Sequence, residues 1–145
     1  MIRAMAYLGL TTPAVDEWRG FGRDILGLQL IADGAELVLV TGGMSVDPDD
    51  VTPSGIRKSG AEVVFYGVPV LPGSMFMLAY HGDIAVCGIP GCVMFNGITS
   101  LDLILPHLFA GECLTRSWAV NLGHGGLCQE CSLCRFPDCA FGKSS

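Results

Sequence analysis

The sequence predicts an α/β fold with three αβα layers, in which helices cover both faces of a mostly parallel sheet. Two observations predict this class. From residue 35 onward, apolar segments of strand length alternate with glycine turns and helical segments, as in parallel sheets whose strands are joined by helices. Half of the 145 residues are hydrophobic and only 15% are charged, so most of the chain is expected to be buried in one core.

Three segments are expected along the chain. Residues 1–33 have a strand-helix-strand pattern, in which Gly27 closes the helix. Residues 34–112 carry the predicted sheet. Residues 113–145 form a tail that is rich in glycine and cysteine and has too little apolar pattern for a core of its own.

Within the second segment, short apolar runs bounded by turn residues predict strands over residues 36–40, 62–66 and 84–87. Two helices are expected between or after them. The first covers residues 53–59. The second covers residues 93–109 and is expected to kink or end at Pro106, because a proline removes a backbone donor from the helix.

Charge and hydropathy argue against two classes of partner. A net charge of -6 and a pI near 4.8 argue against nucleic acid, whose binders cluster Lys and Arg. Two uncharged windows, residues 63–80 and 84–101, have the length of a membrane span, but Pro and Gly interrupt both, so buried strands explain them better. No signal peptide is visible, and a cytoplasmic location is expected.

A glycine turn after the first predicted strand is the first candidate binding site. Thr41-Gly42-Gly43-Met44-Ser45 lies where ligands sit in open parallel sheets, beyond the carboxyl end of a strand. The paired glycines let the backbone approach a phosphate group closely, and the hydroxyls of Thr41 and Ser45 can donate hydrogen bonds to it. A plain tight turn is the alternative.

Three carboxylates follow this turn, on Asp47, Asp49 and Asp50. Three acids beside an anion would repel it unless a divalent cation lies between them, and Mg²⁺ commonly bridges carboxylates and ligand phosphates. The sequence favours such a magnesium-assisted site about as strongly as a solvated helix start, at which Asp50 or Thr52 is the N-cap.

Four cysteines of the tail have the spacing of a metal site. Cys128-x2-Cys131-x2-Cys134-x4-Cys139 places four thiolates in one short loop, which suits tetrahedral Zn²⁺ or a 4Fe-4S cluster. This spacing predicts a Cys-rich C-terminal metal knuckle, with either metal centre. Free thiols are the alternative.

A resemblance to a known family sharpens the prediction. Residues 41–53, TGGMSVDPDDVTP, resemble the signature loop of the molybdenum cofactor biosynthesis domain of molybdopterin adenylyltransferases and molybdopterin molybdenumtransferases. Residues 70–73, VLPG, and 88–91, GIPG, resemble the later ligand loops of that family, in the same order. The tail resembles an extension on some molybdopterin-binding proteins of anaerobic bacteria, which takes the likeness to about residues 35–143. The resemblance implies a partial molybdopterin-binding fold that binds molybdopterin, or adenylated molybdopterin, during cofactor assembly or delivery.

Carried over by position, the resemblance implies a role for each matching residue. The pterin phosphate would be held by four residues of the first loop, namely Thr41, Gly42, Gly43 and Ser45, with Asp47 beside them. Asp50 would be the catalytic acid for metal or adenylate chemistry. The later loops would add contacts from Pro72, Gly73, Gly88, Pro90 and Gly91. Cys92 stands where the family usually has Asn, and no glycine-acid loop precedes residue 35, so binding is expected rather than adenylyl transfer or molybdate insertion.

Residues 1–33 resemble a different family, the extradiol ring-cleavage dioxygenases of the vicinal oxygen chelate type, through Tyr7-Leu8-Gly9 and WRGFGRDILGLQL at residues 18–30. The chain thus reads as a junction of two unlike pieces near residues 31–34. A metal-dependent dioxygenase or glyoxalase-like enzyme is one alternative function, and a Cys-knuckle interaction module without a small-molecule site is another. A homo-oligomer is expected because an exposed sheet edge favours pairing, and a molybdoenzyme is the expected acceptor of the ligand.

Overall fold

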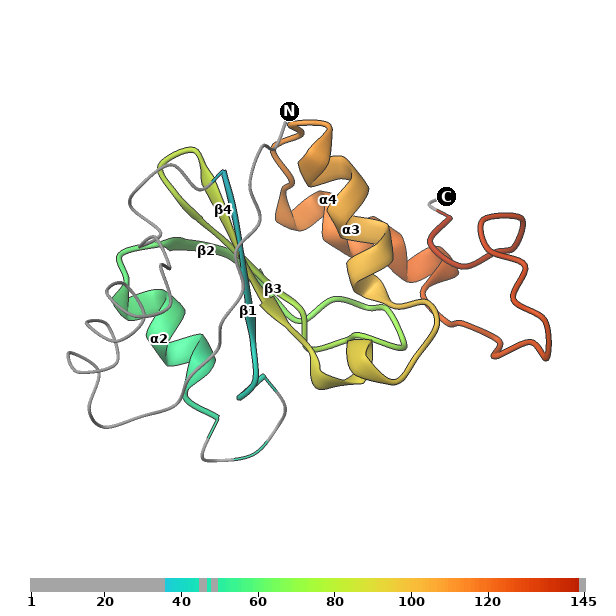
Figure 1. Ribbon diagram of the computed structural model, residues 1–145. Coiled ribbons are helices and arrows are strands. Elements are labelled where there is room, and N and C mark those ends of the chain that lie inside the picture. Colours follow the sequence, from blue (N-terminus) through green and yellow to red (C-terminus); the bar gives the residue numbers. More distant parts are fainter. Residues whose placement is uncertain (1–35, 45–46, 48–49, 144–145) are drawn as a thin grey trace.

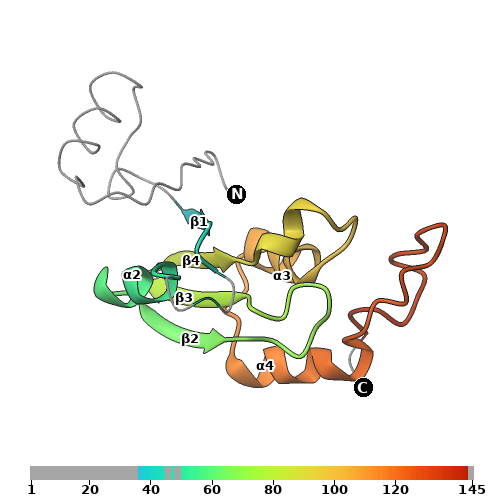
Figure 2. The same cartoon turned by 90° about the horizontal axis from the view of Figure 1, so that it is seen from below.

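A four-stranded sheet with the strand order β1-β4-β3-β2 forms the centre of the molecule. The computed structural model describes residues 36–44, 47 and 50–143. The strands are β1 (Leu37–Thr41), β2 (Glu62–Tyr66), β3 (Met77–His81) and β4 (Ile84–Ile89), and Figure 2 shows them stacked in this order. The strand-helix-strand unit predicted over residues 1–33 lies outside the described residues.

The sheet confirms the α/β class, but it is mixed rather than mostly parallel. Strand β1 pairs with β4 in parallel, whereas β2 with β3 and β3 with β4 are antiparallel pairs. The difference arises from β3, a strand that the sequence analysis did not identify. Gly82 and Asp83 alone separate β3 from β4, and a two-residue turn can join only antiparallel neighbours.

Helices lie on both faces of the sheet, as predicted. Helix α2 (Thr52–Lys58) covers one face, and α3 (Ser100–Phe109) and α4 (Arg116–Asn121) cover the other (Figure 1). Two separate clusters of buried side chains match these layers. Ile56 of α2 packs with Val38, Met77 and Val86, whereas the α3 side gathers a larger group: Phe65, Leu78, Cys87, Leu103, Ile104, Leu108, Ala119, Leu122 and Phe141.

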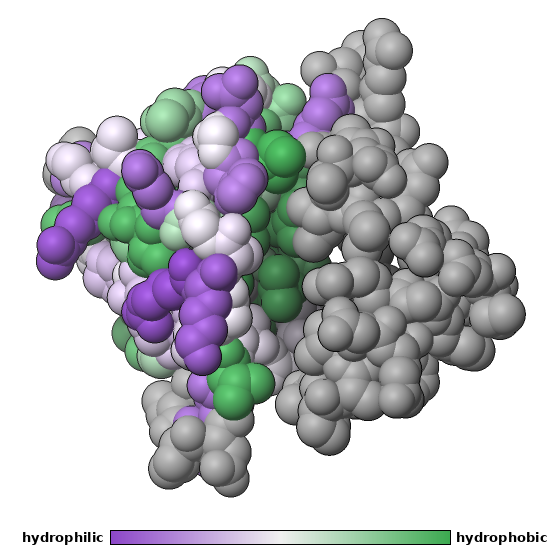
Figure 3. All heavy atoms as spheres, turned by 90° about the vertical axis from the view of Figure 1, so that its left-hand side faces the viewer, coloured by the Kyte–Doolittle hydropathy of each residue, from purple (hydrophilic) through white to green (hydrophobic). Residues whose placement is uncertain are grey.

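Helix α2 is short and amphipathic. It buries Pro53 and Ile56, which are three residues apart and so share one helix face, and it exposes Arg57 and Lys58. Figure 3 looks onto this side of the molecule and shows hydrophilic side chains over much of its coloured surface. Among the described residues, no helix has the length and apolar character that a bilayer crossing needs.

The single helix predicted over residues 93–109 is wrong, because two helices form there. A 3-10 helix, η1 (Gly91–Met94), is followed by five connecting residues and then by α3. Thr99 starts α3 with a capping box: its hydroxyl accepts a hydrogen bond from Leu101 N, and its own backbone N–H donates to Asp102 Oδ2 at 2.7 Å.

Pro106 lies inside α3, which continues to Phe109, so the predicted helix end at Pro106 is wrong. Both Pro106 and the residue four positions before it, Asp102, are exposed. A carbonyl that lacks its helical donor can therefore be hydrated, which lowers the cost of the proline.

The tail packs against the domain instead of forming a separate unit. After α4, a 3-10 helix, η2 (Leu122–Gly125), leads into residues 126–143, and Phe141 near the chain end is buried in the α3-side core at 3% exposure. At the start of the tail, Leu114 N donates to the hydroxyl of Tyr80 at 3.0 Å. Burial raises the pKa of Tyr80, although this hydrogen bond acts in the opposite direction.

Burial of Cys87 at the centre of the sheet predicts alkaline sensitivity. Desolvation raises the pKa of this thiol from 9.0 to about 12, so between these values the folded state holds a proton that the unfolded state has lost. The contribution of Cys87 to the free energy of unfolding should therefore be fully present below the unfolded pKa and should decline as the pH rises towards the folded one. The expected loss by about pH 10 is on the order of 1 kcal/mol.

Urea unfolding in reductant at about pH 8 and about pH 10 measures this loss. We expect the Cys87→Ala variant to lose less stability between these conditions than the parent. Cys131→Ala is the matched control, since Cys131 is exposed. Equal pH dependence in the parent and Cys87→Ala would contradict the buried thiol.

Candidate functional site

The register of the sheet brings the three predicted ligand loops to one edge. Thr41, at the end of β1, pairs with Ile89, at the end of β4, so the turns that follow these parallel strands leave the sheet side by side. Gly88 pairs with Met77, where the antiparallel β3 begins, so the loop that leads into β3 arrives at the same edge. Convergence of the three loops is therefore a consequence of strand pairing.

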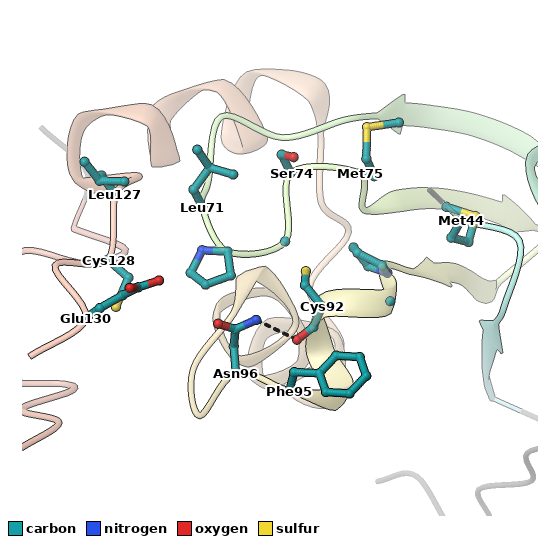
Figure 4. A pocket seen from close by; sticks show the side chains of 14 residues that line it. Met44, Leu71, Ser74, Met75, Cys92, Phe95, Asn96, Leu127, Cys128 and Glu130 are labelled. Atoms are coloured by element: carbon teal, nitrogen blue, oxygen red, sulfur yellow. Dashed lines mark hydrogen bonds between the residues drawn. The ribbon is translucent and has the colours of Figure 1, made fainter. Parts of the chain in front are cut away.

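A pocket of about 730 Å³ lies at this edge (Figure 4). Four segments line it: Met44 after β1, the loop before β3, the loop and 3-10 helix after β4, and part of the tail. The lining residues are Met44, Leu71, Pro72, Gly73, Ser74, Met75, Pro90, Gly91, Cys92, Phe95, Asn96, Leu127, Cys128 and Glu130.

The residues predicted in the three ligand loops lie in four different situations. Four line the pocket, namely Pro72, Gly73, Pro90 and Gly91. Thr41, Gly42 and Gly43 lie at the same edge beside Met44 but are not among the lining residues. Gly88 is buried in β4, and Ser45 lies outside the described residues.

Thr52 holds the glycine turn in place. Its hydroxyl donates to the carbonyl of Gly42 at 2.7 Å, and Gly42 has φ +80°, a left-handed conformation that favours glycine. Thr52 is the first residue of α2, and its N-cap is Val51, with no side-chain cap. The alternative prediction of Asp50 or Thr52 as N-cap is therefore wrong, and Thr52 connects α2 to the candidate phosphate turn.

Asp50 stabilises its own loop. Its Oδ2 accepts a hydrogen bond from Asp47 N at 3.2 Å, and Asp50 N donates to Asp47 O at 3.0 Å. Asp50 is half-buried, Asp47 is exposed, and neither lines the pocket. The carboxylate predicted to be catalytic thus has a structural contact within the acidic loop.

The absence of a side chain at Gly88 leaves the space that Met44 occupies on the sheet. A Cβ atom at residue 88 would lie 2.6 Å from Cε and 2.8 Å from Sδ of Met44. Met44 is 2% exposed and packs with the α2-side core while it also lines the pocket. Gly88 therefore shapes the pocket floor through Met44.

The loop before β3 is fixed by the start of α3. Ser100 N donates to Pro72 O at 3.0 Å, and the Ser100 hydroxyl donates to Gly73 O at 2.7 Å. Ser100 is fully buried. Two hydrogen bonds thus hold Pro72 and Gly73 against the helix, and the N–H of Ser100 is already bonded to the protein.

Part of the tail forms one wall of the pocket. Leu71 N donates to Gly126 O at 2.7 Å, Cys128 N donates to Leu71 O at 2.8 Å, and Leu71 and Leu127 form a parallel bridge. The backbones meet so closely that a Cβ atom at Gly126 would lie 1.9 Å from Pro69 O. The tail is therefore bonded to the same loop that carries Pro72 and Gly73.

The predicted metal knuckle is not supported by the positions of the four tail cysteines. Cys128 lines the pocket, Cys139 packs against the core, and Cys131 and Cys134 are exposed. Within the part of the chain that the structure describes, no three His, Cys, Asp or Glu residues are grouped so that they could hold a metal ion. The donor set for zinc or a 4Fe-4S cluster is therefore not assembled here.

Comparison with known protein families identifies the family of this chain. The model of the probable molybdopterin binding domain matches residues 22–110, which include all three ligand loops. The chain belongs to the molybdopterin-binding domain family. The match begins at residue 22, so residues 22–33, which were expected to belong to a dioxygenase-like segment, lie within the matched region. The pocket wall after residue 110 lies outside it.

Three relatives of this molybdopterin-binding domain are molybdopterin molybdenumtransferases. The protein of Bacillus subtilis (strain 168) is 29% identical over 103 residues, 70% of this chain and 22% of the relative. The protein of Synechococcus elongatus is 28% identical over 91 residues, 61% of this chain and 23% of the relative. That of Haemophilus influenzae is 32% identical over 72 residues, 50% of this chain and 18% of the relative. The chain thus spans less than a quarter of the length of these relatives.

Sequence reasoning missed two parts of the pocket. One is the apolar contribution of Met44, Met75 and Phe95, which no spacing rule marks as ligand-facing. The other is the tail wall, with Leu127, Cys128 and Glu130. The adjacent glycines at 125 and 126 were the available signal, since paired glycines often mark close backbone approach.

Gly126→Ala should detach the tail wall, because its methyl group would overlap Pro69 O. We expect faster hydrogen exchange throughout residues 122–143 and a loss of about 1–3 kcal/mol in the free energy of unfolding. Gly97→Ala is the matched control, since no atom lies within 4 Å of a Cβ at that position. Tail protection that is the same in both variants would show that the wall does not depend on this contact.

Proposed function

We propose that the pocket binds molybdopterin or its adenylated form during assembly or delivery of the molybdenum cofactor. The single observation that carries the proposal is the β1–β4 register, which brings the glycine turn to the edge where the later loops line one pocket. Family membership and three molybdopterin molybdenumtransferase relatives support the same ligand class.

The size and lining of the pocket suit a pterin. Its volume of about 730 Å³ falls within the range of small-molecule sites. Sulfur atoms of Met44, Met75, Cys92 and Cys128 come from its different walls (Figure 4). Such polarisable side chains make favourable contacts with aromatic rings and with the soft sulfur atoms of a dithiolene. Phe95, at 90% exposure on the pocket rim, adds an aromatic face to the entrance.

Backbone amides would hold the phosphate end of the ligand. The described lining residues include no Lys or Arg, so a phosphate group has no side-chain cation there. The Gly42 and Gly43 amides, in a turn with both φ angles positive, offer the alternative. Thr41 precedes them at the end of β1 and would contribute its hydroxyl.

Magnesium is the counter-ion that we propose for this end. Asp47 and Asp50 lie in the loop between the glycine turn and α2, and carboxylate oxygen is the donor type that Mg²⁺ prefers. A cation there would neutralise the repulsion between these acids and a phosphate. Zinc and iron-sulfur stay outside the proposed function, because the described tail does not bring its four cysteines together.

Binding is the function that we propose for the described residues. The Asp50 carboxylate, the candidate catalytic acid, is hydrogen-bonded within its own loop and does not line the pocket. We also propose a homo-oligomer, because β1 is an outer strand of the described sheet and exposed outer strands favour pairing. The proposed acceptor of the ligand is a molybdoenzyme.

Calorimetric titration with molybdopterin tests the glycine turn directly. Gly42→Val should weaken binding at least about tenfold, because the branched side chain strains a left-handed position and obstructs the approach of phosphate. Gly82→Val is the matched control. Gly82 also has a positive φ, +59°, but it lies in the β3–β4 turn at the other end of the sheet. Equal affinity of the parent and Gly42→Val would rule out the glycine turn as the phosphate site.

The magnesium proposal predicts a charge effect that depends on the cation. Asp50→Asn retains an oxygen acceptor for Asp47 N but removes the negative charge. We expect this variant to bind molybdopterin several-fold more weakly than the parent in Mg²⁺, and to equal or exceed it in EDTA, where charge repulsion acts alone. Asp83→Asn, in the remote hairpin turn, should match the parent in both buffers. If the Asp50 variant binds molybdopterin more weakly than the parent by the same factor in EDTA as in Mg²⁺, a bound cation is contradicted.

A further inference from the structure

Glu130 is the one charged residue among the described residues that line the pocket. It belongs to the tail, beyond the region that the family model matches. Figure 4 shows its carboxylate directed into the pocket from the wall that also carries Leu127 and Cys128, with Met44 on the opposite side. One end of the pocket is thus acidic, while the other lies beside the glycine turn.

Glu130 lies two residues after a hydrogen bond that anchors the tail to the pocket loop. In this bond, Cys128 N donates to Leu71 O at 2.8 Å. Glu130 itself has φ +48°, the left-handed region, and is the one non-glycine residue there in the described part of the chain. Glu130 is exposed to solvent, and such a conformation costs an L-residue about 1–2 kcal/mol.

A second acceptor faces the same space. The side-chain amide of Asn96 donates from Nδ2 to Cys92 O at 2.8 Å, which leaves its Oδ1 as an acceptor. Asn96 lines the pocket, and Figure 4 shows its amide oxygen on the far side from that hydrogen bond. Glu130 and Asn96 therefore supply acceptors, which suit a ligand edge made of N–H donors and repel phosphate.

We propose that Glu130 is the specificity residue that recognises the aminopyrimidinone edge of the pterin, with the phosphate directed to the glycine turn. The N3–H and 2-amino groups of a pterin form two adjacent donors, which match the two oxygens of one carboxylate as an arginine fork does. The inference rests on the proposed function and deepens it, because it sets the direction in which the ligand lies. It also gives the tail a role in binding that needs no metal.

Two fluorescent probes that differ at position 2 of the ring test this assignment. 6-Hydroxymethylpterin carries the 2-amino group, and 6-hydroxymethyllumazine has an oxygen in its place. The parent should prefer the pterin, and Glu130→Gln should weaken pterin binding about tenfold while it changes lumazine binding little, so that the preference disappears. Glu62→Gln is the matched control, since Glu62 is an exposed residue that pairs with Tyr80 at the far end of the sheet.

Two results would overturn the proposal, and they differ from each other. If the parent prefers the pterin and Glu130→Gln keeps that preference, Glu130 is not the recognition residue, although the pocket still binds pterins. If the parent binds neither 6-hydroxymethylpterin nor molybdopterin, the proposed function itself is wrong. Hydrogen exchange of residues 122–143 in Glu130→Gln shows whether the wall is retained. If the wall is retained, a loss of preference is assigned to the carboxylate. If the wall is lost, Glu130→Asp replaces Glu130→Gln in the test. A restored wall with a restored preference supports the assignment, and a restored wall without the preference overturns it.

Discussion

Parallel pairing of β1 with β4 is the constraint on which the site depends. Because Thr41 and Ile89 are partners, the glycine turn and the Pro90-Gly91 loop leave the sheet at the same edge and in the same direction. A shift of β1 by one residue would turn its side chains over and remove Leu37 and Val38 from their opposite cores. Burial on both faces thus fixes the relative position of the two loops.

Close contacts then fix the other pocket segments relative to these two strands. Ser100 holds the loop before β3 against α3, Gly88 makes room for Met44, and Gly126 lets the tail reach Pro69. Each contact joins a buried element to a pocket wall. The loops that line the pocket are therefore anchored to secondary structure, and anchored loops need less reorganisation when a ligand enters.

The sequence allowed much of this arrangement to be predicted, since buried strands and glycine turns have strong local patterns. Strand β2 was predicted at its observed bounds, and α2, β1 and β4 within two residues. Strand β3 was missed although Gly82-Asp83 is a hairpin signal, and the break before α3 was missed although Thr99 and Asp102 form a capping box. Docking of the tail depends on tertiary contacts such as Gly126 with Pro69, which no local pattern encodes.

Convergence of three loops on one ligand is most directly tested by amide NMR during titration with molybdopterin. The account predicts that the N–H signals of Gly42, Gly43, Gly73 and Gly91 shift together and saturate at one ligand concentration, while Gly82, at the opposite end of the sheet, stays unchanged. Shifts confined to one of these loops, or centred on the Gly82 turn, would contradict it.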